Sequence, residues 1–170
     1  DTPGLVIIAG GAGAGSRLSD CHVLDVGPRA WAAVQMPTLP LAFPLPSSWH
    51  QMVALGQKLV VFGGMGHKET VSDAIGLVDL TIAEDGGAFA FSAAASMLEL
   101  GDSRPEGRFS HCMIPCPPPA PSGDPDAAEE VNTYTPHAAL IFGGTTADRM
   151  LEDCWLVELS TADAAETDSG

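Results

Sequence analysis

Two stretches of this sequence hold residue types that can carry out chemistry. The segment SHCMIPC (110–116) places one histidine close to two cysteines, and both are side chains that bind zinc. A structural zinc site usually needs four such ligands in two close pairs. The other adjacent pair, Cys21 and His22, lies far away in the chain. We therefore predict no metal site and no cofactor.

Ser110 beside His111 suggests a nucleophile with its base. Adjacent residues of a β-strand point to opposite faces, so these two side chains cannot form such a pair. The segment GGAGAGS (10–16) has the glycine content of a nucleotide-binding loop, but Ser16 stands where a third glycine belongs and a strand is expected after it. We predict no catalytic residue and do not expect this chain to be an enzyme.

The glycines of that segment belong to a pattern that occurs three times. The runs LVIIA, LVVF and ALIF are each followed by a glycine pair, and an aspartate comes nine residues after the second glycine. The pairs are 53 and 80 residues apart, and the longer interval contains a proline-rich insertion at 115–137. Without the insertion both intervals are about 50 residues, a period typical of propeller arrays. The repeated residues, with a histidine that precedes two of the runs, are Gly10, Gly11 and Asp20; His50, Gly63, Gly64 and Asp73; and His111, Gly143, Gly144 and Asp153.

Each repeat has the features of a four-stranded antiparallel meander. Short continuous apolar runs are typical of strands buried on both faces. The glycine pair lets the chain turn and lets neighbouring backbones approach, and the aspartate can tie the end of the loop. Trp31, six residues after Asp25, can cover the gap between adjacent sheets. The expected strands span 5–11, 21–26 and 30–36; 49–55, 58–64, 74–81 and 88–98; and 109–115, 138–144 and 153–159.

These residues resemble the kelch repeat. Arg108 and His111 match its Arg-x-x-His strand, the three glycine pairs match its Gly-Gly strand ends, and Asp25 with Trp31 matches its spacing from acid to tryptophan. Ser47 replaces the arginine in the second copy, where Phe89 or Phe91 must stand in for the tryptophan. The resemblance covers about residues 5–159. It implies an all-β fold of kelch-like β-propeller blades.

The repeats predict an incomplete propeller within residues 1–160. Blades are expected at 5–36, 49–98 and 108–159, the last with the insertion 115–137, and an acidic, disordered tail at 161–170. The first copy lacks its first strand, the third lacks its fourth, and three blades cannot close a ring. We interpret the sequence as a fragment of a longer propeller, in preference to a chain whose copies complete a ring. Open blade edges also favour self-association.

Charge and cysteine content restrict the partners. The net charge of −15 disfavours binding to nucleic acid and to anionic membrane surfaces, and no apolar stretch approaches the ~20 residues that span a bilayer. Four cysteines are too few for a disulfide scaffold, and we interpret Cys21 and Cys154 as small buried apolar residues. The sequence therefore predicts a cytoplasmic or nuclear chain that binds another protein.

A meander predicts where such a partner would bind. The loop before the first strand and the loop between the second and third strands lie at the same end, which collects four of the seven Lys and Arg residues. The arrangement resembles that of kelch-like modules, which bind short peptides with such loops. We expect a protein-interaction or scaffold module; the alternative is part of a propeller enzyme with catalytic residues outside this sequence. The candidate binding residues are Arg17, Ser47, Ser48, His67, Lys68, Arg104 and Arg108.

Overall fold

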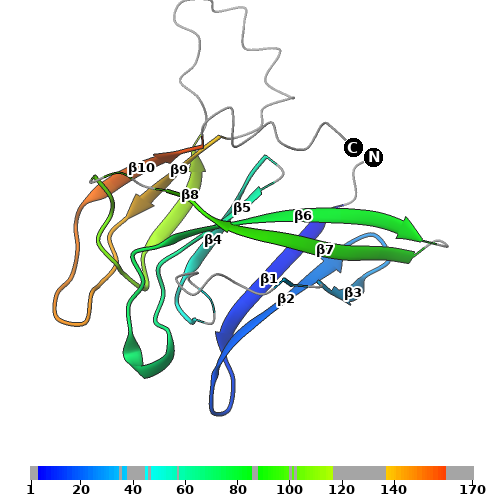
Figure 1. Ribbon diagram of the computed structural model, residues 1–170, viewed down its shortest axis with the longest axis horizontal. Coiled ribbons are helices and arrows are strands. Elements are labelled where there is room, and N and C mark those ends of the chain that lie inside the picture. Colours follow the sequence, from blue (N-terminus) through cyan, green and yellow to red (C-terminus); the bar gives the residue numbers. More distant parts are fainter. Residues whose placement is uncertain are drawn as a thin grey trace, which may run out of the picture.

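The described residues form three separate antiparallel sheets (Figure 1). The computed structural model describes residues 4–34, 36–37, 45, 47–56, 58–85, 88–99, 101, 103–116 and 137–159. The first sheet contains β1 (Leu5–Ala12), β2 (Arg17–Asp25) and β3 (Ala30–Ala33). The second contains β4 (Gln51–Leu55), β5 (Lys58–Phe62), β6 (Ile75–Asp85) and β7 (Ala88–Met97), and the third contains β8 (Cys112–Cys116), β9 (Ala138–Phe142) and β10 (Cys154–Glu158).

Strands that follow one another in the sequence are neighbours in each sheet. The strand orders are β1-β2-β3, β4-β5-β6-β7 and β10-β9-β8, so every sheet is an up-and-down meander. The prediction of an all-β chain built from antiparallel meanders is confirmed, and each expected strand overlaps one observed strand. Among the described residues the second sheet alone has four strands. Within the described part of the chain, β1 has a neighbouring strand on one side only, and so does β10.

The core lies in the two spaces between the sheets. Phe62, Val60 and Leu77 of the second sheet pack with Met113 and Ile141 of the third. On the opposite face of the second sheet, a different set of side chains packs toward the first sheet. That set comprises Leu59, Val61, Val78 and Phe91, which meet Ile7, Ala9, Cys21 and Val23.

The strand β5 shows why the apolar runs are continuous. Leu59, Val60, Val61 and Phe62 are all buried, although successive side chains of a strand point to opposite faces. The second sheet is covered on both faces, so none of these four positions can be polar without losing apolar burial. The sequence pattern therefore reports a sheet that lies between two others.

In the first sheet and in the third, the described residues cover one face and leave the other face exposed. Val6 and Ile8 of β1 point away from the second sheet and are exposed. In the third sheet Ile114, Phe142 and Leu156 are exposed in the same way, with 55% of Phe142 accessible. In the repeat, Ile8 corresponds to the buried Val61 and Phe142 to the buried Phe62. These two outward faces thus have the composition of faces that are buried in the second sheet.

All three glycine pairs have the same backbone conformation. The first glycine has φ of 65°, 69° and 63°, and the second has φ of 106°, 90° and 97°. Residues with a side chain rarely adopt these angles, which explains why glycine recurs here. A Cβ at Gly63 would lie 2.3 Å from the carbonyl oxygen of Arg108, so the close approach of the third sheet also requires glycine.

Two expectations about single residues differ from the structure. Cys21 is buried between the first two sheets, but Cys154 is exposed, because its equivalent face in the third sheet has no cover among the described residues. Trp31 lies on the outward face of the first sheet and is exposed, so it does not cover the gap toward the second sheet. Phe91 of β7 lies in that gap instead, packed with Val23.

Several predicted features fall outside the described residues. These are most of the insertion 115–137, the tail 161–170 and the side chain of Phe89. Within the described part of the chain, no helix is both long and apolar enough to cross a membrane.

Candidate functional site

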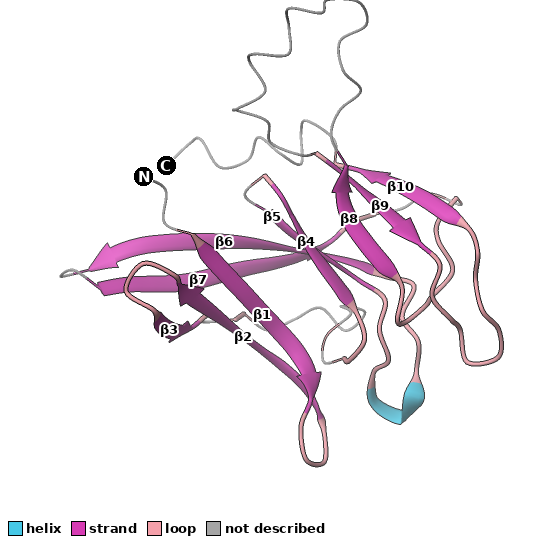
Figure 2. Cartoon of the chain, turned by 180° about the vertical axis from the view of Figure 1, so that it is seen from behind, coloured by secondary structure: helices cyan, strands magenta, loops and turns pink. Residues whose placement is uncertain are grey.

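The loops predicted to share one end of the sheets do lie together. Backbone bridges join Ser48 to Met65 and Phe109 to Thr145, so each loop before a first strand contacts the loop between the second and third strands. Figure 2 shows these loops at the lower end of the sheets, with the short 3₁₀ helix η1 (His67–Glu69) in cyan. We call this the loop end.

The glycine pairs also connect one sheet to the next at the loop end. The N–H group of Gly11 donates a hydrogen bond to the carbonyl oxygen of Ser47 over 2.8 Å. The N–H group of Gly64 donates in the same way to Arg108, again over 2.8 Å. Ser47 and Arg108 are equivalent in the repeat, so the same bond joins both pairs of sheets. This repeated contact fixes the positions of the loops relative to one another.

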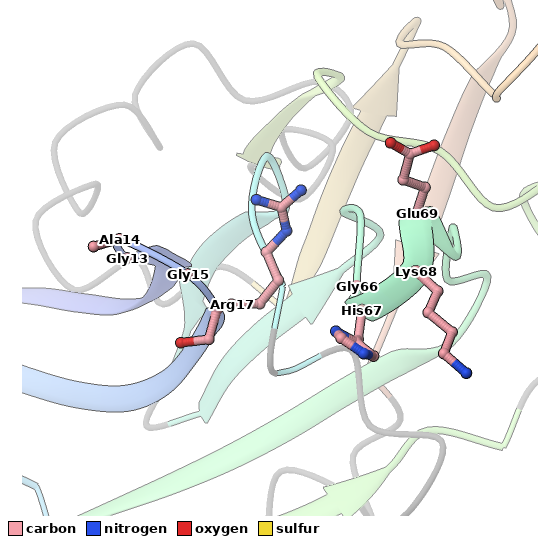
Figure 3. A pocket seen from close by; sticks show the side chains of 9 residues that line it. Gly13, Ala14, Gly15, Arg17, Gly66, His67, Lys68 and Glu69 are labelled. Carbon is pink, nitrogen blue, oxygen red and sulfur yellow. The ribbon is translucent and has the colours of Figure 1, made fainter.

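A hollow of about 290 Å³ opens between the first and second sheets at the loop end. Its walls are the β1–β2 hairpin, residues 13–17, and the turn at residues 66–69. Figure 3 shows the hairpin and η1 facing each other across it, with the side chain of Arg17 between them. The hollow thus brings together Arg17, His67 and Lys68, three of the predicted binding residues.

Arg17 begins a row of side chains that crosses all three sheets. Its guanidinium carbon lies 5.3 Å from the ring centroid of Trp49, within the range of a cation–π contact. The Trp49 ring lies 5.8 Å from that of Phe109 in the loop before β8. Trp49 is 54% exposed, so it presents an apolar surface beside a positive charge. Trp49 was not predicted from the sequence, although a tryptophan directly after the predicted residues Ser47 and Ser48 is a usable signal.

The turn that carries His67 and Lys68 has an unusual backbone. Lys68 and Glu69 both have positive φ, at 57° and 59°, which is uncommon for residues with side chains. The turn is closed by a hydrogen bond from the N–H of Gly66 to the carbonyl oxygen of Thr70, at 2.7 Å. His67 and Lys68 are exposed, and Figure 3 shows Lys68 and Glu69 pointing in opposite directions.

Arg108 has a different environment, because its side chain is 0% exposed. Its guanidinium donates to both carboxylate oxygens of Asp153, at 2.5 and 2.9 Å, and to the carbonyl oxygen of Gly143 at 3.0 Å. The hydrogen bond from Arg108 is the main reason why the pKa of Asp153 falls from 3.8 to about 2. Arg108 therefore braces the third sheet, and no part of its side chain is accessible to a partner.

The remaining predicted binding residues are buried or already paired within the chain. Ser47 and Ser48 are buried, and the hydroxyl of Ser47 lies 3.1 Å from Nδ1 of His50. Arg104 is exposed but forms an ion pair with Asp73 at 3.1 Å. The hollow is thus lined by Arg17, His67 and Lys68 but not by Ser47, Ser48, Arg104 or Arg108.

The two repeat histidines lie between sheets. The ring of His111 packs edge-on against Phe62, with ring centroids 5.2 Å apart, and neither ring nitrogen has a hydrogen-bond partner among the described residues. Burial, with the positive charge of Arg108, lowers the pKa of His111 to about 4. Burial also lowers the pKa of His50, against hydrogen bonds to Ala9 and Ser47 that raise it. Both histidines are therefore packing residues.

A second hollow, of about 500 Å³, lies beside the β9–β10 loop. Glu106, Glu152 and Asp153 line it, and Arg149 forms an ion pair with Glu106 at its wall. Sequence reasoning did not find this hollow, because Glu106 and Arg149 are far apart in the chain. Within the described part of the chain, no group of three His, Cys, Asp or Glu side chains is placed to hold a metal ion.

No model of a protein family matches the chain, and no curated protein matches it. The kelch resemblance therefore rests on the repeated residues themselves.

Proposed function

We propose that this chain is a kelch-like protein-interaction module whose loop end binds an acidic segment of a partner protein. The supporting observation is the state of its positive side chains. Lys58, Arg104, Arg108 and Arg149 each have a carboxylate partner. Among the described residues Arg17, Arg29 and Lys68 have no such partner, and two of these three, Arg17 and Lys68, line the same hollow.

The net charge gives this hollow its selectivity. The chain carries −15 overall, so most of its surface repels an acidic segment. An acidic segment is therefore attracted chiefly to the positive side chains without a carboxylate partner, and two of these, Arg17 and Lys68, lie together at the hollow. Complementary charge of this kind speeds encounter and excludes wrong partners more than it adds affinity.

Trp49 supplies an apolar contact next to the charge. Tryptophan and arginine are enriched among the residues that dominate binding at protein interfaces. Arg17 already lies over the Trp49 ring, so little side-chain freedom remains to be lost when a partner binds. A segment with carboxylates and one apolar side chain fits this combination best.

The free thiols of three cysteines are consistent with a reducing compartment. Cys21, Cys112 and Cys154 carry free thiols, and two of them are exposed. Exposed thiols are typical of proteins from the cytoplasm or nucleus, and we propose that location for this module.

Charge reversal tests the proposal. A fluorescent oligoglutamate peptide serves as the probe, and its anisotropy reports binding. We expect Arg17→Glu and Lys68→Glu each to weaken binding by about tenfold, and higher salt to weaken binding to the unaltered chain.

Arg29→Glu is the matched control, since it changes the net charge equally. Arg29 lies in the turn between β2 and β3, at the other end of the first sheet. Equal weakening by Arg29→Glu, or unchanged binding by folded Arg17→Glu and Lys68→Glu variants, would reject the loop end as the binding site.

A further inference from the structure

Among the cations that the structure describes, Arg17 alone is partly buried without a hydrogen-bonding partner. Lys58 and Arg108, the other cations that are not exposed, each form an ion pair with an aspartate. The side chain of Arg17 forms neither an ion pair nor a hydrogen bond with a described residue, and its contact is the ring of Trp49. A guanidinium stacked on a ring keeps the N–H donors of its own plane free, so Arg17 can still bind an anion.

The tip of the β1–β2 hairpin adds uncharged donors beside Arg17. The N–H group of Gly13 donates to the carbonyl oxygen of Ser16 over 2.8 Å. The N–H groups of Ala14 and Gly15, and the hydroxyl of Ser16, form no hydrogen bond with a described residue. A Cβ placed on Gly15 would have no described atom within 4 Å, so a ligand can approach the backbone there.

The turn that carries η1 forms the opposite wall of the hollow and is held by its own hydrogen bonds. Gly66 and Thr70 close it through their backbones, and the hydroxyl of Thr70 donates to the carbonyl oxygen of His67 over 2.9 Å. Lys68 extends from this wall on a flexible side chain that can turn toward an anion in the hollow. Glu69 also lines the hollow, but it points in the opposite direction from Lys68 (Figure 3).

This set of donors matches a phosphoryl group better than a carboxylate. A phosphorylated side chain carries a charge of about −1.5 to −2 and three strong acceptor oxygens, which suits the two positive charges of Arg17 and Lys68. The guanidinium fork of an arginine also binds phosphate with two parallel hydrogen bonds. The hollow, at about 290 Å³, lies just below the range of roughly 300–1,000 Å³ that drug-sized ligands occupy. It therefore fits one phosphorylated side chain better than a larger ligand.

We propose that the hollow binds a phosphorylated serine or threonine side chain of a partner protein. This inference rests on the proposed function, because it names the group within the acidic segment that the loop end selects. Nucleic acids and anionic lipid surfaces would bring many negative charges close to a chain of net charge −15. A phosphorylated side chain brings its charge to Arg17 and Lys68, and Trp49 beside them can contact an apolar neighbour in the same segment.

The test compares three fluorescent peptides that differ at one position. Each is a run of glutamates around a central phosphoserine, glutamate or serine, and anisotropy measures its affinity for the unaltered chain. We expect the phosphoserine peptide to bind at least about tenfold more tightly than the other two. Inorganic phosphate, added as a competitor, should displace the phosphoserine peptide only at concentrations far above the Kd of that peptide.

A variant that keeps the charge tests the role of the guanidinium. Arg17→Lys retains the positive charge but removes the fork of donors. We expect it to weaken binding of the phosphoserine peptide by about tenfold and to change binding of the glutamate peptide by less than about threefold. Arg29→Lys, at the other end of the first sheet, is the matched control and should change neither affinity.

The outcomes separate this inference from the proposed function. Equal affinity for the phosphoserine and glutamate peptides would overturn the phosphoryl site and leave the acidic-segment site standing. Binding of none of the peptides would overturn both. Displacement by inorganic phosphate at the Kd of the phosphoserine peptide would show a site for the free anion, and would overturn recognition of a partner segment. These comparisons use the unaltered chain, so they remain decisive if Arg17→Lys does not fold.

Discussion

Arg108 and Asp153 form a pair whose two members should differ in their effect on stability. The Arg108 side chain is fully buried, whereas 42% of the Asp153 side chain is exposed. Replacing Asp153 by alanine leaves a buried positive charge with only carbonyl oxygens around it. Replacing Arg108 by methionine leaves a carboxylate that water can reach, and an apolar side chain in the buried space.

The magnitudes follow from that difference. Removing the partner of a buried charge costs about 3–5 kcal/mol of unfolding free energy, so we expect Asp153→Ala to fall in this range. Arg108→Met loses charged hydrogen bonds to Asp153 and the bond to Gly143 but strands no buried charge. We expect it to cost about 2–3 kcal/mol.

Urea unfolding followed by tryptophan fluorescence measures both values, with the double variant closing the cycle. The control is Arg104→Met with Asp73→Ala, an exposed ion pair that should contribute no more than about 1 kcal/mol. An Asp153→Ala variant within about 1 kcal/mol of the unaltered chain, or one less damaging than Arg108→Met, would refute the reasoning.

The other predictions concern pH, the glycine pairs and the outward faces. Since the pKa of His111 falls from 6.5 to about 4, the unfolded state binds more protons in that range, and the free energy of unfolding should fall as pH drops from 6.5 to 4. His111→Phe should reduce this loss, and the part that remains is expected from His50, whose pKa is also lowered. The low pKa of Asp153, about 2, should add a further loss of about 1 kcal/mol below pH 4, after allowance for its solvent exposure. Gly63→Ala should cost at least about 2 kcal/mol in urea unfolding because of its φ of 69° and the Arg108 carbonyl oxygen, whereas Gly15→Ala should stay within about 0.5 kcal/mol. Phe142→Lys should lower any concentration-dependent light scattering if the outward face of the third sheet drives self-association, and equal scattering by the variant would exclude that face.

The fold was predictable from the sequence because the same residues recur at the same spacing in all three repeats. The positive φ of Gly10, Gly63 and Gly143 is a backbone requirement that glycine meets, so it appears as a fixed pattern in the chain. The continuous run at β5 likewise shows that both of its faces are buried. The exposure of Cys154 was not predictable, because it depends on whether another sheet covers that face.

The site was less predictable, because it depends on contacts between distant residues. Arg17 and Lys68 were proposed from their place in the meander, and they do line one hollow. Arg108 was proposed on the same ground, yet its partner Asp153 is 45 residues away and holds it inside the third sheet. The position of a basic residue in the sequence therefore predicts which loop carries it, but not whether its charge is exposed.

The three tryptophans of this chain allow a direct test of the proposed binding site. Trp49 lies in the row beside Arg17, Trp31 on the outward face of the first sheet, and Trp155 beside Asp153 in the third. Their indole N–H signals can be followed by NMR while an oligoglutamate peptide is added. Binding at the loop end predicts a large, saturable shift of the Trp49 signal with little change at Trp31. A saturable shift at Trp31 with none at Trp49 would contradict it.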